Sequence, residues 1–246
     1  MLIALMADIH SNREALAACL AHAEAARVDR LVFLGDYVGY GADPGWVVDT
    51  VSRHVERGAT AVIGNHDAAV AVPDEHMNAM ARTAIAWTRG ELDPGQRAFL
   101  ASLPLTAEED DRLFVHANAW APGGWGYILG ELDARRSLRA TERIYTFCGH
   151  VHVPALYHMA ANGGVSGFIP TADIAVPVLP RRHWLAVLGA VGQPRDGNPA
   201  ACYGLFDTAE GTLTYARVPY DVERAAQKII AAGLPPSLAA RLLVGH

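Results

Sequence analysis

The stretch Thr60-Ala61-Val62-Ile63-Gly64-Asn65-His66-Asp67 joins a short apolar run to a glycine and three polar residues. The apolar half is typical of a buried strand, and the glycine lets the backbone turn sharply where the strand ends. An amide oxygen, an imidazole and a carboxylate in a row suit a reactive centre, because the carboxylate can orient the imidazole. The stretch therefore predicts a strand that ends in a functional site.

Two earlier apolar runs end in the same way. Residues 2–7 lead into Asp8-Ile9-His10, and residues 31–34 lead into Gly35-Asp36. Helical segments separate the three runs, and strands that alternate with helices predict a parallel βαβ sheet. Ligands of such sheets bind outside the carboxyl ends of the strands. The topology therefore predicts that these polar groups and Asn65 lie close together.

The remaining chain predicts a helical segment and a second group of strands. Residues from about 68 to 103 are rich in alanine and predict a helical insertion beside the site. Two further short strands lead to histidines, one to His116 and one to Gly149-His150-Val151-His152. Later strands are expected at 155–159, 184–188, 201–206 and 212–218, followed by a helix at 222–232. No linker interrupts this pattern, so we expect one domain over residues 1–246.

Composition narrows the class of protein. The chain has 246 residues, of which 51% are hydrophobic and 19% charged, so it can bury a large core. A formal net charge of −6 makes a nucleic-acid partner unlikely but leaves room for a small phosphate ester. Three scattered cysteines predict no disulfide framework. No run has the length of a membrane span or the form of a signal peptide, so a cytoplasmic protein is expected.

Each polar motif also has an ordinary explanation when it stands alone. Asp8-x-His10 reads either as a helix cap with a surface histidine or as two ligands of a divalent ion, and Asp36 reads as a turn residue. Five motifs at five strand ends favour a shared metal site over coincidence. The side chains of ligand type are Asp8, His10, Asp36, Asn65, His116, His150 and His152.

These motifs, in this order, resemble the signature of the calcineurin-like metallophosphoesterase superfamily. The residues around them are similar to those of the compact prokaryotic phosphoesterases of that superfamily. The motifs cover residues 8–152, and the segment Gly192-Gln193-Pro194-Arg195-Asp196 extends the similarity further along the chain. The resemblance implies an α/β fold, a four-layer α/β/β/α sandwich of two packed mixed β-sheets flanked by helices. It also implies two divalent metal ions, of manganese, iron, zinc, nickel or cobalt.

The resemblance further implies a role for each motif. One ion would be held by Asp8, His10 and His152, the other by Asn65, His116 and His150, and Asp36 would bridge them. Hydroxide shared by the two ions would attack phosphorus in line. His66 would protonate the leaving group, and Asp67 would polarise and steady its imidazole.

One motif departs from the pattern of the protein Ser/Thr phosphatases, which read Gly-Asp-x-Val-Asp-Arg-Gly. This chain has Gly35-Asp36-Tyr37-Val38-Gly39-Tyr40-Gly41, so Tyr40 replaces an arginine that grips phosphate. Arg195 is a candidate replacement, and Asn12 and Tyr40 are further candidate substrate contacts. Aromatic side chains either line a pocket that suits a diester or a nucleotide or simply pack. The aromatic candidates are Tyr37, Tyr40, Trp120 and Trp125.

We therefore expect a dinuclear metal-dependent phosphoesterase that hydrolyses a small phosphodiester, phosphomonoester or nucleotide. The alternatives are a protein Ser/Thr phosphatase, a dinucleoside polyphosphate hydrolase, a nuclease and a catalytically silent metal-binding module. The acidic net charge counts against a nuclease. The complete ligand set and the presence of His66 count against a silent module. No motif predicts an oligomeric state.

Overall fold

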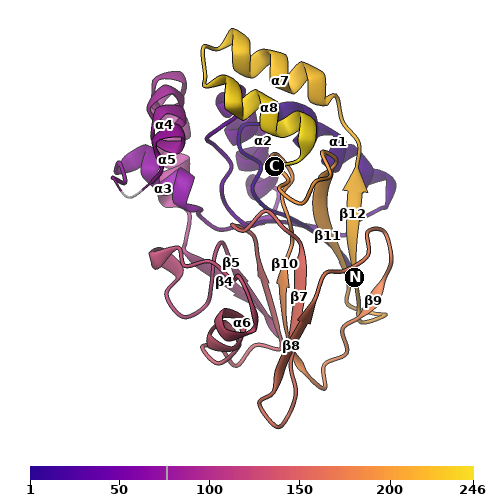
Figure 1. The fold of residues 1–246 in the computed structure, drawn as a ribbon. Coiled ribbons are helices and arrows are strands. Elements are labelled where there is room, and N and C mark those ends of the chain that lie inside the picture. The colour runs from indigo at the N-terminus through magenta and orange to yellow at the C-terminus, as the bar shows by residue number, and fades with distance from the viewer. Residues whose placement is uncertain (76) are drawn as a thin grey trace.

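Two six-stranded mixed β-sheets pack face to face, with helices on both outer faces (Figure 1). The computed structural model describes residues 1–75 and 77–246. This arrangement confirms the four-layer α/β/β/α sandwich that the resemblance implied. Among the described residues, no helix is both long enough and apolar enough to cross a membrane.

The first sheet has the strand order β3-β2-β1-β11-β12-β9. Its first three strands run parallel, and antiparallel pairing begins where β11 joins β1. The strands in sheet order are β3 (Thr60–Ala61), β2 (Arg30–Phe33), β1 (Leu2–Met6), β11 (Ala201–Asp207), β12 (Thr212–Val218) and β9 (Val176–Pro177).

The second sheet has the strand order β4-β5-β6-β10-β7-β8. Its three central strands are parallel, and the pairs toward both edges are antiparallel. The strands in sheet order are β4 (Thr106–Glu109), β5 (Arg112–Val115), β6 (Tyr145–Cys148), β10 (His183–Val187), β7 (Ala155–Met159) and β8 (Val165–Phe168). Strands β4, β8 and β9 were not predicted from the sequence.

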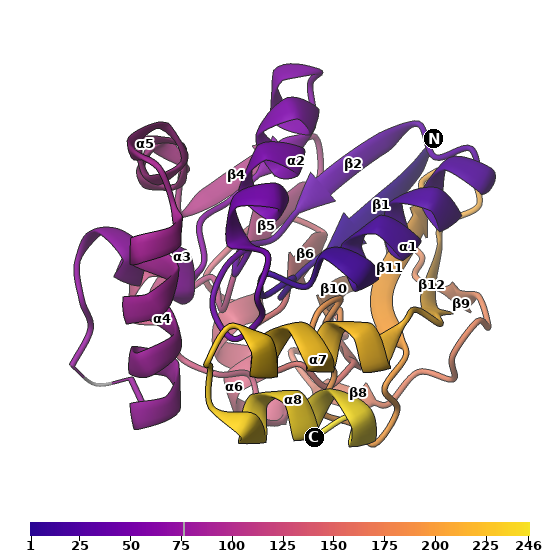
Figure 2. The same cartoon turned by 90° about the horizontal axis from the view of Figure 1, so that it is seen from above.

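The helices form separate groups around the sheets. Those against the first sheet are α1 (Arg13–Ala25) and α2 (Pro44–Glu56), and α6 (Glu131–Leu138) lies against the second. A second group is α3 (Asn65–Ala71), α4 (Ala79–Glu91) and α5 (Pro94–Ser102), and a short 3-10 helix is η1 (Pro122–Gly124). At the end of the chain α7 (Val222–Ala231) and α8 (Pro236–Val244) lie side by side (Figure 2).

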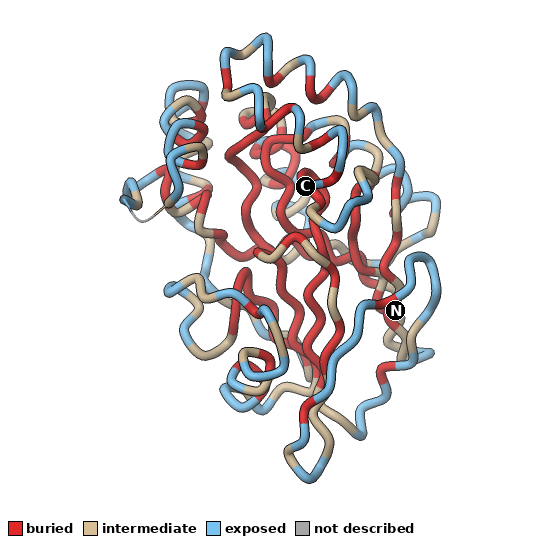
Figure 3. The backbone as a smooth tube through the Cα atoms, in the orientation of Figure 1, coloured by how far each residue is buried: buried red, intermediate tan, exposed pale blue. Residues whose placement is uncertain are grey.

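The core explains why β1 is apolar at every position. Successive side chains of a strand point to opposite faces, so Ile3 and Leu5 pack between the sheets, while Ala4 and Met6 pack toward the helices. Both faces are covered, as expected of parallel strands. Figure 3 shows the buried residues running along the strands at the centre of the molecule.

Candidate metal centre

The polar motifs meet where parallel strands of both sheets end. Asp8 follows β1, Asp36 follows β2, and Asn65 opens α3, which begins four residues after the end of β3. The second sheet supplies His116 after β5 and the two histidines after β6. Asn65 is partly exposed, whereas the other expected ligands are buried. Topology therefore brings all seven predicted side chains to one edge.

Three overlapping groups of side chains have potential ligand atoms within 4.8 Å of one another. Asn65 joins the third group, because its Oδ1 lies 3.2 Å from His116 Nε2. Asp36 belongs to two groups, with Oδ2 3.7 Å from His10 Nε2 and 3.4 Å from His116 Nε2. The groups are Asp8, His10 and His152; His10, Asp36 and His66; and Asp36, His116 and His150. A central carboxylate therefore lies between two histidine clusters.

Two pairs of imidazoles point nitrogen at nitrogen. His10 Nε2 lies 3.0 Å from His152 Nε2, and His116 Nε2 lies 3.1 Å from His150 Nδ1. The other ring nitrogen of each histidine faces a backbone carbonyl, and a carbonyl can only accept. The acceptors are Val38 O at 3.1 Å, Gln193 O at 2.7 Å, Leu34 O at 2.8 Å and Trp125 O at 2.9 Å.

These outer hydrogen bonds determine the tautomers. Each outer nitrogen carries the proton, so in the neutral ring the inner nitrogen presents a lone pair. Two lone pairs that face each other at about 3 Å repel, and a shared cation removes that repulsion. The donor set of imidazole, carboxylate and amide oxygen suits borderline divalent ions. The residues present therefore fit a metal pair.

Burial alone would lower the pKa of His116, but the neighbouring Asp36 carboxylate raises it to about 9, whereas at the other clustered histidines burial prevails. It lowers the pKa of His150 to about 3 and lowers that of His10 and His152 well below the usual value. Burial raises the pKa of Asp8 to about 8. Burial alone would also raise the pKa of Asp36, but the neighbouring histidine charges lower it overall. The centre is thus built to receive positive charge.

The backbone is strained at the predicted ligands. Positive φ angles occur at Asp8 (56°), His10 (49°), Asp36 (55°), His150 (68°) and His152 (64°). Such left-handed conformations cost residues with a Cβ about 1–3 kcal/mol each and gather at functional sites. Backbone hydrogen bonds between the loops after β1 and β2 stabilise these conformations. The Asp8 N–H donates to Gly35 O at 3.1 Å, and the His10 N–H donates to Asp36 O at 2.9 Å.

Asp67 does not polarise His66, so that prediction is wrong. Its carboxylate accepts backbone N–H bonds from Asp36 at 2.7 Å, Tyr37 at 2.9 Å, Val38 at 3.2 Å and Gly64 at 2.9 Å. No hydrogen bond to the His66 imidazole is formed by Asp67, and within the described part of the chain the buried His66 Nδ1 has no partner. Asp67 instead fastens the Asp36 loop to the start of α3.

His66 lies among aromatic rings at the same edge. Its ring centroid is 4.9 Å from that of His10 and 4.6 Å from that of Tyr40. A Cβ added at Gly39, whose φ is +88°, would collide with His66 Nδ1. The Nδ1 edge therefore faces the Gly39 backbone, and burial lowers the pKa of the ring.

The aromatic candidates divide between the core and the site. Tyr37 is fully buried and donates to backbone carbonyls of Phe33 and Val62, so it does not line a substrate pocket. Tyr127 was not predicted, yet its half-exposed ring stacks on His150 at 4.1 Å. The sequence signal for it was only the aromatic and glycine-rich composition of residues 117–130.

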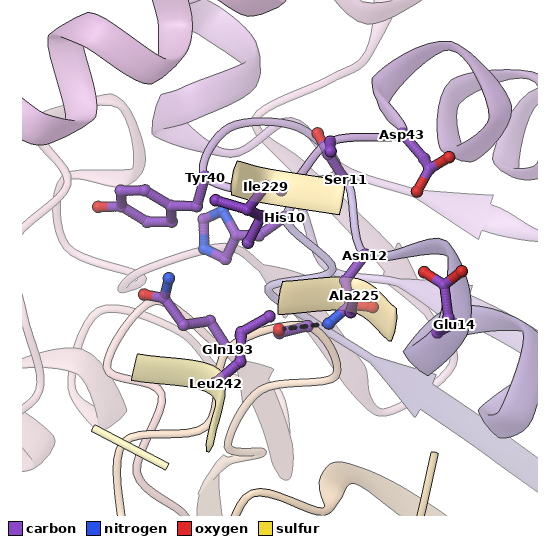
Figure 4. A pocket seen from close by; sticks show the side chains of 13 residues that line it. His10, Ser11, Asn12, Glu14, Tyr40, Asp43, Gln193, Ala225, Ile229 and Leu242 are labelled. Carbon is purple, nitrogen blue, oxygen red and sulfur yellow. Dashed lines mark hydrogen bonds between the residues drawn. The ribbon is translucent and has the colours of Figure 1, made fainter. Parts of the chain in front are cut away.

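The predicted substrate contacts differ in how many hydrogen bonds their side chains already form within the protein. Asn12 Oδ1 accepts from Ala15 N at 3.1 Å, and its Nδ2 donates to Gly192 O at 2.8 Å (Figure 4) and to Tyr220 Oη at 3.2 Å. This side chain is therefore a helix cap and a loop tie. The Arg195 guanidinium lies 5.7 Å from the centroid of the Tyr40 ring.

Comparison with known proteins identifies the family. The family model for the calcineurin-like phosphoesterase superfamily domain matches residues 1–211. An uncharacterized protein of Methanocaldococcus jannaschii is 31% identical over 256 residues, covering 100% of this chain and 98% of that protein. A crystal structure of a metallophosphoesterase from Sphaerobacter thermophilus is 34% identical with a TM-score of 0.88, covering 100% of this chain and 99% of that one.

A second solved structure supports the fold alone. It is a hypothetical protein from Pyrococcus horikoshii OT3, 18% identical with a TM-score of 0.79, and the match covers 100% of this chain and 98% of that one. The overall folds match despite the low sequence identity. The chain belongs to the calcineurin-like phosphoesterase superfamily.

Proposed function

We propose that this protein is a dinuclear metal-dependent phosphoesterase that hydrolyses a small phosphate ester. The observation that carries the proposal is the two nitrogen-to-nitrogen imidazole pairs with the Asp36 carboxylate between them. The proposed ligands of one ion are Asp8, His10 and His152, those of the other are Asn65, His116 and His150, and Asp36 serves both. When bound, such an ion pair activates water at neutral pH and neutralises charge on the phosphate.

The chain's own groups would position the ester and move the proton. We assign the protonation of the leaving oxygen to His66, and because its Nδ1 edge faces Gly39, Nε2 is the nitrogen proposed to carry that proton. Asp67 supports this indirectly, because it fixes the loop of Asp36. Tyr40 and Arg195 are proposed to line the substrate side, and a substrate contact of Asn12 stays a prediction.

The ester is proposed to be a phosphodiester, phosphomonoester or nucleotide, with no nucleic acid or membrane as partner. Tyr40 in place of the phosphate-gripping arginine argues against a protein phosphatase, and the net charge of −6 argues against a nuclease. We propose one catalytic domain over residues 1–246, with α3, α4 and α5 as its helical insertion. A cytoplasmic location stays a prediction.

Metal analysis combined with a substrate survey tests the proposal. Purified protein is loaded in turn with manganese, iron, zinc, nickel or cobalt and assayed with p-nitrophenyl phosphate and bis(p-nitrophenyl) phosphate. We expect about two bound ions per chain and saturable hydrolysis with at least one metal. Protein that binds metal yet hydrolyses neither ester under any ion would favour the silent module, and protein that binds none would refute the proposal.

A further inference from the structure

Arg195 is a cation at the metal centre that has no carboxylate partner among residues 1–75 and 77–246. Its Nη2 and Nε atoms instead donate to the side-chain oxygen of Gln193, at 2.9 Å and 3.3 Å. Because its hydrogen-bond partner is a neutral amide, the positive charge of the guanidinium is not compensated by a negative one. The planar arrangement of its N–H donors suits a phosphate group.

The loop that carries both residues is tied to the predicted metal ligands. Gln193 O accepts from His152 Nδ1 at 2.7 Å, and the Arg195 N–H donates to His152 O at 3.2 Å. One residue earlier, the Gly192 N–H donates to Asp8 O at 2.8 Å. Burial is the main cause of the lowered pKa of His152, and the charge of Arg195 adds to it. The guanidinium therefore stands at the centre rather than on a distant surface.

The side-chain amide of Gln193 has an unused N–H donor beside the metal centre. The side chain is 1% exposed, and within the described residues its Nε2 has no hydrogen-bond partner. Reversing the amide would set its NH2 against the donors of Arg195, so the orientation follows from the contacts. A buried donor without an acceptor costs about 1–3 kcal/mol, which points to a missing ligand. Figure 4 shows the amide end of Gln193 on the same side as Tyr40 and His10.

We propose that Gln193 is a specificity-determining residue that aims Arg195 at a phosphoryl group of the substrate and donates its own N–H to that group. The inference rests on the proposed function and names its substrate class. A glutamate here would neutralise Arg195, whereas glutamine leaves one positive charge for the ligand. A phosphomonoester carries up to two negative charges and a diester carries one, so the pair favours the monoester.

The test compares Gln193→Met, Gln193→Glu and Arg195→Met with the matched control Gln227→Met, whose side chain is exposed on α7. Each metal-loaded protein is assayed with p-nitrophenyl phosphate and bis(p-nitrophenyl) phosphate, and its affinity for inorganic phosphate is measured by calorimetry. We expect kcat/KM for the monoester to fall about tenfold in Gln193→Met and further in Gln193→Glu, mainly through KM. The diester should change by less than about threefold, and phosphate affinity should weaken in parallel with the monoester.

The double variant Gln193→Met/Arg195→Met separates the two contacts. When Arg195 is already replaced by Met, we expect Gln193→Met to cause only a small further fall in kcat/KM for the monoester. That remaining fall measures the direct contact between the Gln193 N–H and the substrate. Metal content and melting temperature near those of wild type show that the variants fold. Wild-type KM and phosphate affinity in both Gln193 variants, or equal losses on both esters, would overturn the inference. A wild-type protein without turnover would refute the proposed function, and the phosphate titration would still test Gln193.

Discussion

The substitution Asp67→Asn tests whether Asp67 supports the Asp36 loop or the His66 imidazole. Its two carboxylate oxygens accept four backbone N–H bonds, two of them from Asp36 and Tyr37. An amide has a single acceptor oxygen, so two of these bonds are lost whichever way it turns, and its NH2 then faces two N–H donors. A hydrogen bond to a charged group contributes about 1.5–3 kcal/mol, so the loss amounts to about 3–6 kcal/mol.

This loss is large beside the roughly 5–15 kcal/mol by which domains are stable, but bound metal can offset part of it. We therefore expect a lower free energy of unfolding in urea for the metal-free variant. Metal affinity should also fall about 10–100-fold, because Asp36 loses the anchor of its backbone. Chelator competition measures that affinity, and kcat should recover substantially once the metal saturates.

A matched control is Asp207→Asn, at the half-buried last residue of β11. Asp207 Oδ1 accepts from Ala209 N at 2.9 Å and from Glu210 N at 3.2 Å, and asparagine retains that oxygen. Its unfolding free energy should change by less than about 0.5 kcal/mol. If Asp67→Asn instead lowered kcat while stability and metal affinity stayed at wild-type values, Asp67 would act on His66 and our structural account would be refuted.

Three further outcomes are expected. His66→Ala should abolish turnover and retain both ions, and loss of metal by elemental analysis would instead make His66 a ligand. Gly39→Ala should lower kcat with metal content unchanged, because its Cβ meets His66 Nδ1 and its φ of +88° costs about 1–2 kcal/mol; a wild-type kcat would contradict this. Chelation should lower the melting temperature, since free metal at 100 times its Kd stabilises each site by about 2.7 kcal/mol, and an unchanged melting curve would argue against ordered metal sites.

The sequence alone determined the fold class and the group of ligand-type residues. Both follow from local order, because a short apolar run followed by a polar pair marks the carboxyl end of a strand. Parallel strands must then bring Asp8, Asp36 and Asn65 to one edge, as observed. Strands β4, β8 and β9 were not predicted, since β4 and β8 have four residues without a continuous apolar run and β9 has only two residues.

The tertiary structure decided which side chains face one another. Adjacent residues on a helix point about 100° apart, so Asp67 turns away from the His66 ring and toward the loop after β2. Tyr37 is in the core because its hydroxyl reaches the backbone carbonyl of Val62, which directly follows β3. The contact of Gln193 with His152 joins residues 41 positions apart, and no local pattern reports it. Long-range contacts of this kind set tautomers, loop strain and the aim of Arg195, and only the folded chain contains them.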